Sequence, residues 1–138
     1  MVYGRIGAAH MDQLRALQKA YKSAIGESAP TEEDLDSLRE AILRERILFF
    51  GAWDGDILAG CCSVTVGFST FDYRPSGVFE DFYILPPYRH RGIARQLAET
   101  AYRESGVSTM TVGCADCDRD MYRALGFSVP LGNLLAYE

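Results

Sequence analysis

The spacing of apolar residues predicts an opening strand and two helices in the first third of the chain. We expect the short apolar-rich stretch over residues 2–6 to be a strand. Residues 11–25 keep a helical period, with apolar side chains at Met11, Leu14, Leu17, Tyr21 and Ile25. Thr31 followed by three acidic residues is typical of a helix start, because a hydroxyl caps free N–H groups and acids suit the positive end. This second helix is predicted to run to about Arg46.

The middle of the chain predicts three strands of one sheet. Residues 47–53 are rich in β-forming side chains, and Asp54-Gly55 is a strong signal for a tight turn. Together with residues 57–66, they predict a hairpin. We expect residues 68–77 to form a loop or the end of a hairpin, and residues 78–85 to form the third strand.

Two adjacent prolines at positions 86 and 87 end this third strand, because proline donates no backbone hydrogen bond. Helical spacing then predicts a helix over about residues 89–104, from the apolar positions Ile93, Leu97, Ala98 and Ala101. Gly106 is its stop signal.

The last quarter of the chain predicts a further strand over residues 107–114 and a short helix over residues 116–125. One or two closing strands are expected over residues 127–137. The chain has no internal repeat or linker, and its 138 residues suit one hydrophobic core. We therefore expect a single mixed α/β (α+β) domain over residues 1–138.

Composition and charge narrow the possible functions. The chain is 48% hydrophobic and 24% charged, which is ordinary for a globular protein. No apolar run approaches the roughly 20 residues needed to span a bilayer, and no signal-peptide pattern is present, so we expect a cytoplasmic protein without a membrane partner. The net charge of −5 argues against a nucleic-acid partner and is compatible with a cationic small substrate.

The four cysteines raise the question of a metal or redox site. Cys114 and Cys117 have the C-x-x-C spacing of such sites. Cys61 and Cys62 are adjacent in a predicted strand, so their side chains point to opposite faces and cannot both bind one metal. No histidine lies near either pair. We expect four reduced thiols and no metal, and a zinc or thiol-redox protein stays as a competing function class.

Three basic residues stand at the predicted start of the helix over 89–104. Arg89, His90 and Arg91 occupy a position that is already positive through the free N–H groups of the helix. A bound anion such as a phosphate accounts for this crowding, and the small residues Gly92 and Ala94 let a bulky anion approach the backbone. The alternative is a solvated basic turn paired with nearby carboxylates.

The spacing of these residues resembles the acetyl-CoA motif of the Gcn5-related N-acetyltransferases, Q/R-x-x-G-x-G/A. Arg89-x-x-Gly92-x-Ala94 follows a strand that ends in Phe-Tyr-Ile-Leu-Pro, as the motif does in that family. The resemblance implies a mixed, mostly antiparallel sheet flanked by about four helices, with a splayed strand pair that holds CoA. It also implies a set of residues that bind acetyl-CoA: Ile84, Leu85, Arg89, His90, Arg91, Gly92, Ile93, Ala94 and Arg95.

A second resemblance lies in residues 120–127, which look like the Y-x-x-x-G-F segment of the same family. It places Tyr122 near the CoA sulfur, where a phenol that is protonated at neutral pH can act as general acid. The alternative is a core tyrosine on an amphipathic helix. Many members carry an asparagine that contacts CoA ahead of this tyrosine, but Ala115 stands at that position here. Whether Asp116 or Asp118 replaces the contact stays open.

The resemblance also supplies a mechanism for the strand over residues 78–85. It implies that the strand diverges from the next one and that the N–H of Ile84 faces the thioester carbonyl. Glu80 lies an even number of residues from Ile84, so we expect both on one face and interpret Glu80 as the catalytic base. Residues 79–84 are similar to the corresponding stretch of spermidine/spermine acetyltransferases. Asp81 is expected to face away and to have a structural role.

These patterns lead to an acetyl-CoA-dependent N-acetyltransferase that needs no metal. It is expected to move the acetyl group to a primary amine of a small molecule or peptide within a ternary complex. Acidic residues at Glu80, Asp116 and Asp118 favour a cationic amine, but no motif identifies the acceptor. Another acyl-CoA and a non-catalytic CoA-binding regulatory module remain alternatives, and a homodimer is compatible with the sequence.

Overall fold

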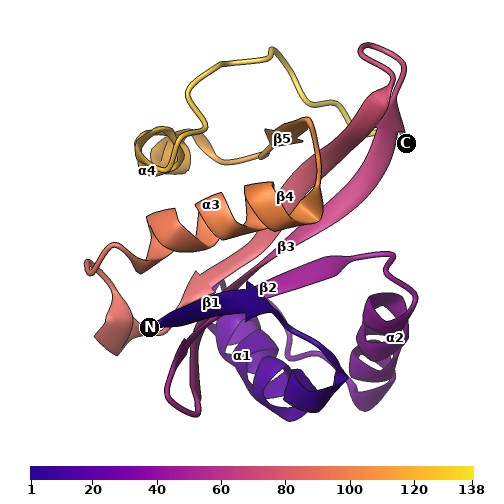
Figure 1. Cartoon of the computed structure of the whole chain (residues 1–138). Coiled ribbons are helices and arrows are strands. Elements are labelled where there is room, and N and C mark those ends of the chain that lie inside the picture. Colours follow the sequence, from indigo (N-terminus) through magenta and orange to yellow (C-terminus); the bar gives the residue numbers. More distant parts are fainter.

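The computed structural model describes residues 1–138 and contains one five-stranded sheet with helices on both faces (Figure 1). The strands lie in the order β1-β2-β3-β4-β5, and all neighbours are antiparallel except β4 and β5, which are parallel. The elements are, in chain order, β1 (Val2–Arg5), α1 (Met11–Ala24), α2 (Glu32–Leu43), β2 (Leu48–Asp54), β3 (Ile57–Ser69), β4 (Arg74–Ile84), α3 (Ile93–Ser105), β5 (Thr109–Thr111) and α4 (Arg119–Ala124).

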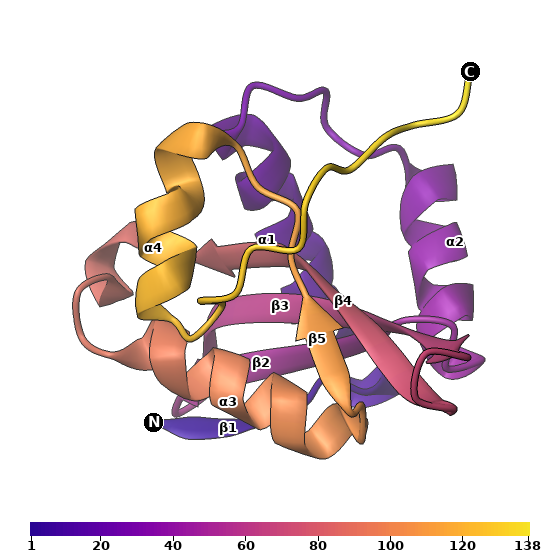
Figure 2. The same cartoon turned by 90° about the horizontal axis from the view of Figure 1, so that it is seen from above.

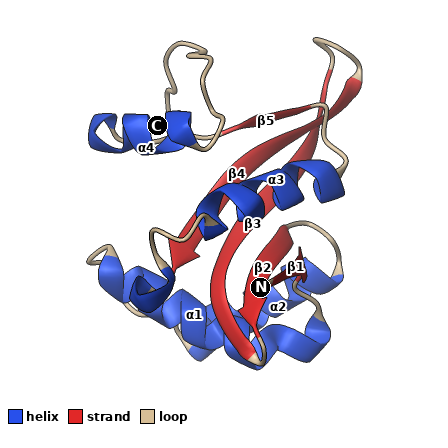
Figure 3. Cartoon of the chain, turned by 60° about the vertical axis from the view of Figure 1, so that its left-hand side comes forward, coloured by secondary structure: helices blue, strands red, loops and turns tan.

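Two hydrophobic clusters hold the helices to the two faces of the sheet. The α3 cluster buries Leu97 and Ala101 of α3 against strand residues that include Phe79 and Val64. The α1 cluster buries Leu14 and Leu17 of α1 against the other face, at residues that include Phe49 and Cys61. Figure 3 shows α3 on one side of the sheet and α1 on the other. No helix is long and apolar enough to cross a bilayer.

The two predicted helix signals at Thr31 and Gly106 are confirmed by their caps. The hydroxyl of Thr31 accepts from the N–H of Asp34 at 3.1 Å, and the Asp34 carboxylate accepts from the N–H of Thr31 at 2.8 Å. Gly106 ends α3 in a left-handed conformation with φ of 73°, which glycine adopts without steric cost. The helix that starts after Thr31 ends at Leu43, earlier than predicted.

The hairpin of β3 and β4 is longer than predicted. The expected loop over residues 68–77 is paired strand except at residues 70–73, because Gly67 stands opposite Ser76 and Phe68 opposite Pro75. Asp72 stabilises the tip, since its carboxylate accepts from the N–H of Arg74 and from the hydroxyl of Ser108.

The predicted closing strands over residues 127–137 are wrong. These residues form no regular element and run along the surface to the C-terminus (Figure 2). Pro130 lacks a donor for a strand ladder, and Gly132 has φ of 99°, which interrupts an extended backbone. The preceding strand, β5, is likewise only three residues long instead of spanning 107–114.

Strands β4 and β5 diverge, as the sequence resemblance implies. They pair only where Ser76–Val78 meets Thr109–Thr111. Beyond Val78, β4 continues to Ile84 without a partner on this edge, while the chain after β5 leads away to α4 (Figure 3). The backbone groups on that edge of β4 are therefore open to a ligand.

Candidate active site

The loop between β4 and α3 brings the predicted basic residues together, but in a conformation that the sequence did not indicate. A short 3-10 turn over Pro86–Tyr88 follows β4, and α3 begins only at Ile93. His90 and Gly92 have φ of 62° and 79°, in the left-handed region, which interrupts a right-handed helix. The prediction that Arg89, His90 and Arg91 form the first helical turn is therefore wrong, because they lie in the loop that precedes the helix.

This loop carries a row of backbone N–H groups without protein acceptors. The groups of residues 90–95 make no hydrogen bond, and the first helical bond runs from the N–H of Gln96 to the carbonyl of Gly92 at 3.3 Å. A Cβ added at Gly92 would meet no atom within 4 Å, so the space in front of this residue is open. Consecutive free N–H groups at a helix start are the arrangement that binds a phosphate. We call residues 90–95 the donor row.

The cations around the donor row differ in their partners. The Nε of Arg89 donates to the carbonyl of Ile84 at 2.9 Å, and its guanidinium lies 5.5 Å from the Tyr83 ring. This contact ties the loop to the end of β4. Arg91 lies 5.6 Å from the ring of Tyr88. Neither arginine has a carboxylate within 4.0 Å, which weighs against the alternative of a basic turn neutralised by acids.

Two other predicted CoA-binding residues are engaged within the protein. The N–H of Leu85 donates to the carbonyl of Ala59 at 2.8 Å, so this donor is not free for a ligand. The guanidinium of Arg95 pairs with Glu99 at 3.5 Å and reaches the carbonyl of Ala124 at 3.5 Å. Arg95 thereby links α3 to the end of α4.

A β-bulge in β4 overturns the predicted orientation of Glu80. Glu80 stands opposite Ser63, and Tyr83 stands opposite Cys61. Between these two pairs β4 advances by three residues and β3 by only two, so β4 contains one extra residue. Asp81, within the bulge, has φ of 53°.

The bulge reverses the alternation of side chains along β4. Phe79 and Ile84 both belong to the α3 cluster although they are an odd number apart. Glu80, adjacent to Phe79, therefore faces α1, and the prediction that it shares a face with the Ile84 side chain is wrong. Sequence periodicity misses such a bulge because Asp81 is not a glycine.

The α1 face of the sheet gathers polar side chains at this bulge. The Asp81 carboxylate accepts from the hydroxyl of the fully buried Ser63 at 2.6 Å. This confirms a structural contact for Asp81. Tyr83 packs against Tyr21 of α1, with ring centroids 5.9 Å apart. Burial raises the pKa of Tyr21, and the charges of Asp81 and Glu80 raise it further, so these groups lie close together.

Sequence reasoning missed Tyr21, Ser63 and Tyr83 as members of this site. Tyr21 appeared only as an apolar position of a helix, and Ser63 as one residue of a strand. Their role depends on which side chains face the bulge, and no local pattern carries that information.

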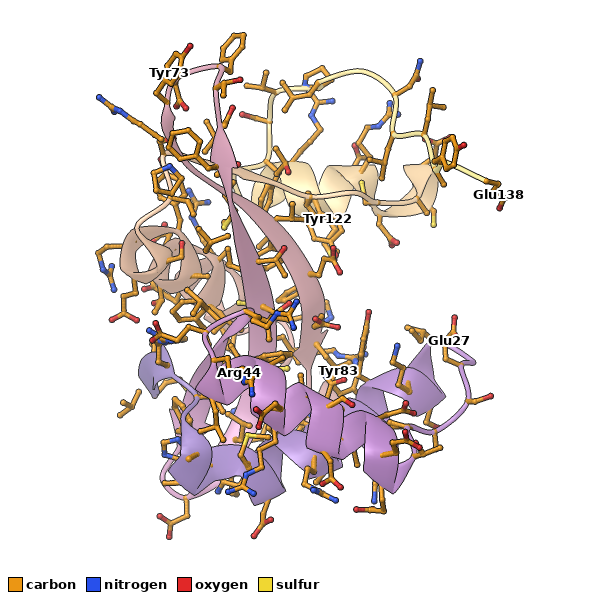
Figure 4. The ribbon with its side chains drawn as sticks, turned by 90° about the vertical axis from the view of Figure 1, so that its right-hand side faces the viewer. Glu27, Arg44, Tyr73, Tyr83, Tyr122 and Glu138 are labelled. Atoms are coloured by element: carbon orange, nitrogen blue, oxygen red, sulfur yellow. The ribbon has the colours of Figure 1, made fainter.

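Tyr122 combines packing with an accessible position in the site. Its ring contacts Phe82 and Phe127, with centroid distances of 6.3 and 5.9 Å. Burial, and then the charge of Asp118, raises the pKa of Tyr122 to about 12, so the phenol stays protonated at neutral pH. Figure 4 shows Tyr122 just below α4 and Tyr83 farther down, and the contact with Tyr21 places Tyr83 at α1.

All four cysteines are free, and the two pairs differ in their surroundings. Cys61 belongs to the α1 cluster and Cys62 to the α3 cluster, which confirms that their side chains point to opposite faces. Burial raises the pKa of both thiols, which keeps them protonated. Cys114 and Cys117 are exposed and free, and no three His, Cys, Asp or Glu side chains gather as a metal site.

Comparison with known proteins identifies a family and a fold. The model of the acetyltransferase (GNAT) family matches residues 11–127. No curated protein matches the sequence. The structure of a probable acetyltransferase superposes with a TM-score of 0.84 at 21% identity, covering 100% of this chain and 99% of that one.

Two structures of aminoglycoside acetyltransferases are also similar. One is an enzyme from an uncultured soil metagenomic sample in complex with sisomicin, with a TM-score of 0.83, 15% identity and coverage of 99% and 94%. The other is AAC(6')-Iy with the bisubstrate analog CoA-S-monomethyl-acetylneamine, with a TM-score of 0.81, 19% identity and coverage of 99% and 96%. At these identities the likeness shows a common fold.

Proposed function

The chain belongs to the acetyltransferase (GNAT) family, and we propose that it transfers an acetyl group from acetyl-CoA directly to a primary amine of a small molecule or peptide. The observation that carries this proposal is the donor row at residues 90–95, which follows in the chain directly after the unpaired edge of β4. A phosphate site and an open strand edge next to each other fit the pyrophosphate and the pantetheine arm of a CoA molecule.

In the proposed complex, the donor row binds the pyrophosphate of acetyl-CoA. Its N–H groups are free at the start of α3, and Arg91 adds a cation that has no carboxylate partner. The pantetheine arm then follows the edge of β4 beyond Val78, where its amides replace the missing pairing with β5. This brings the thioester to the end of β4.

The transfer step is assigned to three groups near the bulge. Glu80 accepts a proton from the ammonium form of the acceptor, directly or through water. The amine nitrogen then attacks the thioester carbon, and the N–H of Ile84 donates to the oxyanion. Because a backbone N–H lies in the plane of the sheet, the reversal of side-chain faces at the bulge is compatible with this role. The carbon–sulfur bond breaks, and the Tyr122 hydroxyl donates its proton to the CoA thiolate. The nitrogen, positively charged after its attack, loses its second proton to the Tyr122 phenolate through water, which leaves a neutral amide and restores the phenol, and Glu80 returns its proton to solvent.

The acceptor site is proposed to lie on the α1 face. Glu80 and the half-buried rings of Tyr21 and Tyr83 provide a negative and aromatic surface, which suits a cationic amine. The similar structures with sisomicin and with an acetylneamine analog make amine-bearing sugars a first group to test.

A thiol-release assay with acetyl-CoA tests this function. The panel of acceptors contains aminoglycosides, polyamines, amino acids and peptides, and reactions without acceptor are the control. We expect release of CoA that depends on at least one amine. If calorimetry shows CoA binding and no amine on the panel increases thiol release, the regulatory-module alternative replaces the proposal.

A further inference from the structure

The bulge in β4 contains two acidic residues that have different surroundings. Glu80 is exposed, whereas the carboxylate of Asp81 is held at 2.6 Å by the hydroxyl of Ser63. Both side chains lie on the α1 face with Ser63. Glu80 stands directly opposite Ser63 in the strand register, and Asp81 accepts the hydrogen bond of the Ser63 hydroxyl. The extra residue of the bulge thus places a fixed carboxylate beside a free one.

The backbone of Asp81 shows why the bulge needs this contact. A φ of 53° is unfavourable for any residue with a Cβ, although aspartate tolerates it better than most. Ser63 is fully buried, and its hydroxyl donates its hydrogen bond to the carboxylate of Asp81. The thiol of Cys61 also donates to the carbonyl of Asp81 at 3.5 Å. Two groups of β3 therefore hold both the side chain and the backbone of the bulge residue.

We infer that Asp81 is a positioning residue for the acyl transfer, and that its hydrogen bond from Ser63 fixes the bulge that directs Glu80 and Tyr83 toward the acceptor. This inference rests on the proposed function. Without the bond, the strand still pairs with β3 on both sides of the bulge, but residues 80–83 gain freedom to change direction. Binding of the CoA pyrophosphate at residues 90–95 is outside this region and stays unchanged.

Three substitutions separate the hydrogen bond from charge and from backbone strain. Ser63→Ala removes the donor. Asp81→Gly removes the acceptor but suits a positive φ, so it relieves strain and tests the bond in a folded protein. Asp81→Asn removes the charge but keeps an oxygen that accepts from Ser63 and tolerates the left-handed backbone. Ser69→Ala, near the tip of the same hairpin, is the matched control for loss of a β3 hydroxyl.

We expect Ser63→Ala and Asp81→Gly to lower kcat about tenfold while CoA affinity changes less than about twofold, because only the position of groups at the transfer step is lost. Asp81→Asn is expected to keep kcat within about threefold of wild type, and Ser69→Ala to behave as wild type. Wild-type kcat in Asp81→Gly overturns the inference. It is equally overturned if Asp81→Asn loses as much activity as Asp81→Gly, because charge and not the bond would then be responsible.

Amide hydrogen exchange of residues 79–84 tests the same contact without relying on catalysis. We expect these amides to exchange at least about tenfold faster in Asp81→Gly and Ser63→Ala than in wild type, and to be slow in Asp81→Asn. Unchanged exchange in both variants overturns the inference. If wild type transfers acetyl groups to no amine, the proposed function fails, and the exchange experiment alone decides whether Ser63 holds the bulge.

Discussion

The two faces of the sheet differ in what they contribute. The α3 face is lined by a continuous apolar cluster in which Phe79, Phe50 and Leu97 are fully buried. The α1 face has an apolar base as well, but near the end of β4 it carries a buried serine and two carboxylates, Glu80 and Asp81. In the proposed mechanism, one face of this strand serves packing and the other serves the transfer step.

The difference shows how one strand can serve both purposes. Regular alternation would give each face every second residue, whereas the bulge at Asp81 adds one residue to the α1 face without moving Phe79 or Ile84 out of the α3 cluster. The packed face anchors α3, and the start of α3 carries the donor row. We expect substitutions at the donor row to affect binding, and those on the α1 face to affect the transfer step.

The largest effect is expected from Gly92→Glu at the donor row. The new carboxylate repels the phosphates, and its Cβ is strained at φ of 79°, so CoA affinity should fall at least about 100-fold in calorimetry. Gly106→Glu is the matched control, because it places the same side chain at φ of 73° at the other end of α3. Equal CoA affinity in folded Gly92→Glu and wild type removes the donor row as the phosphate site.

Tyr122→Phe tests the contribution of α4 to the transfer step. The ring and its contacts with Phe82 and Phe127 are kept, and only the hydroxyl is lost. We expect kcat to fall about 100-fold while the melting temperature stays within a few degrees, since general acid catalysis is typically worth 10²–10⁴-fold. With an acyl donor whose thiol is more acidic, the mutation should lower kcat by a smaller factor, because that thiolate needs less protonation to leave. A wild-type rate with acetyl-CoA would mean that Tyr122 only packs.

Glu80→Gln separates the α1 face from the donor row. We expect a loss of about tenfold in rate, largest at low pH where the amine is most fully protonated, with unchanged acetyl-CoA affinity. Glu104→Gln on the exposed side of α3 controls for loss of a negative charge. If the pH–rate profile of Glu80→Gln coincides with that of wild type, another group or solvent removes the amine proton.

The smallest effect concerns stability at high pH. The Tyr122 phenol releases its proton near pH 10 when unfolded but only near pH 12 when folded, so the unfolded state binds fewer protons between these values. The free energy of unfolding should therefore fall as pH rises through this window, and it should fall less in Tyr122→Phe. Urea unfolding at about pH 9 and about pH 11 measures both slopes. Equal slopes would contradict the raised pKa of Tyr122.

Much of the fold and the donor row could be predicted from the sequence because they depend on local patterns. Thr31 and Gly106 mark helix ends by their own chemistry, and the spacing from Arg89 to Ala94 indicates the proposed phosphate site. The start of α3 was misplaced because helical spacing does not reveal the left-handed His90.

The α1 face could not be predicted in the same way. The orientation of Glu80 depends on a bulge at a non-glycine residue, and the role of Ser63 on a contact across two strands. The predicted closing strands failed because apolar residues alone do not provide a pairing partner. These features arise from tertiary structure, to which local periodicity is blind.

Mass spectrometry with trideuterioacetyl-CoA distinguishes direct acetyl transfer to a primary amine from transfer through an acetylated protein. An amine that stimulates thiol release is incubated with the labelled donor and the protein, and the masses of both the amine and the intact protein are measured over time. We predict one trideuterioacetyl group on the amine and none on the protein at any time before completion. A labelled protein that later loses its label to the amine, or CoA release without a labelled amine, would contradict direct transfer.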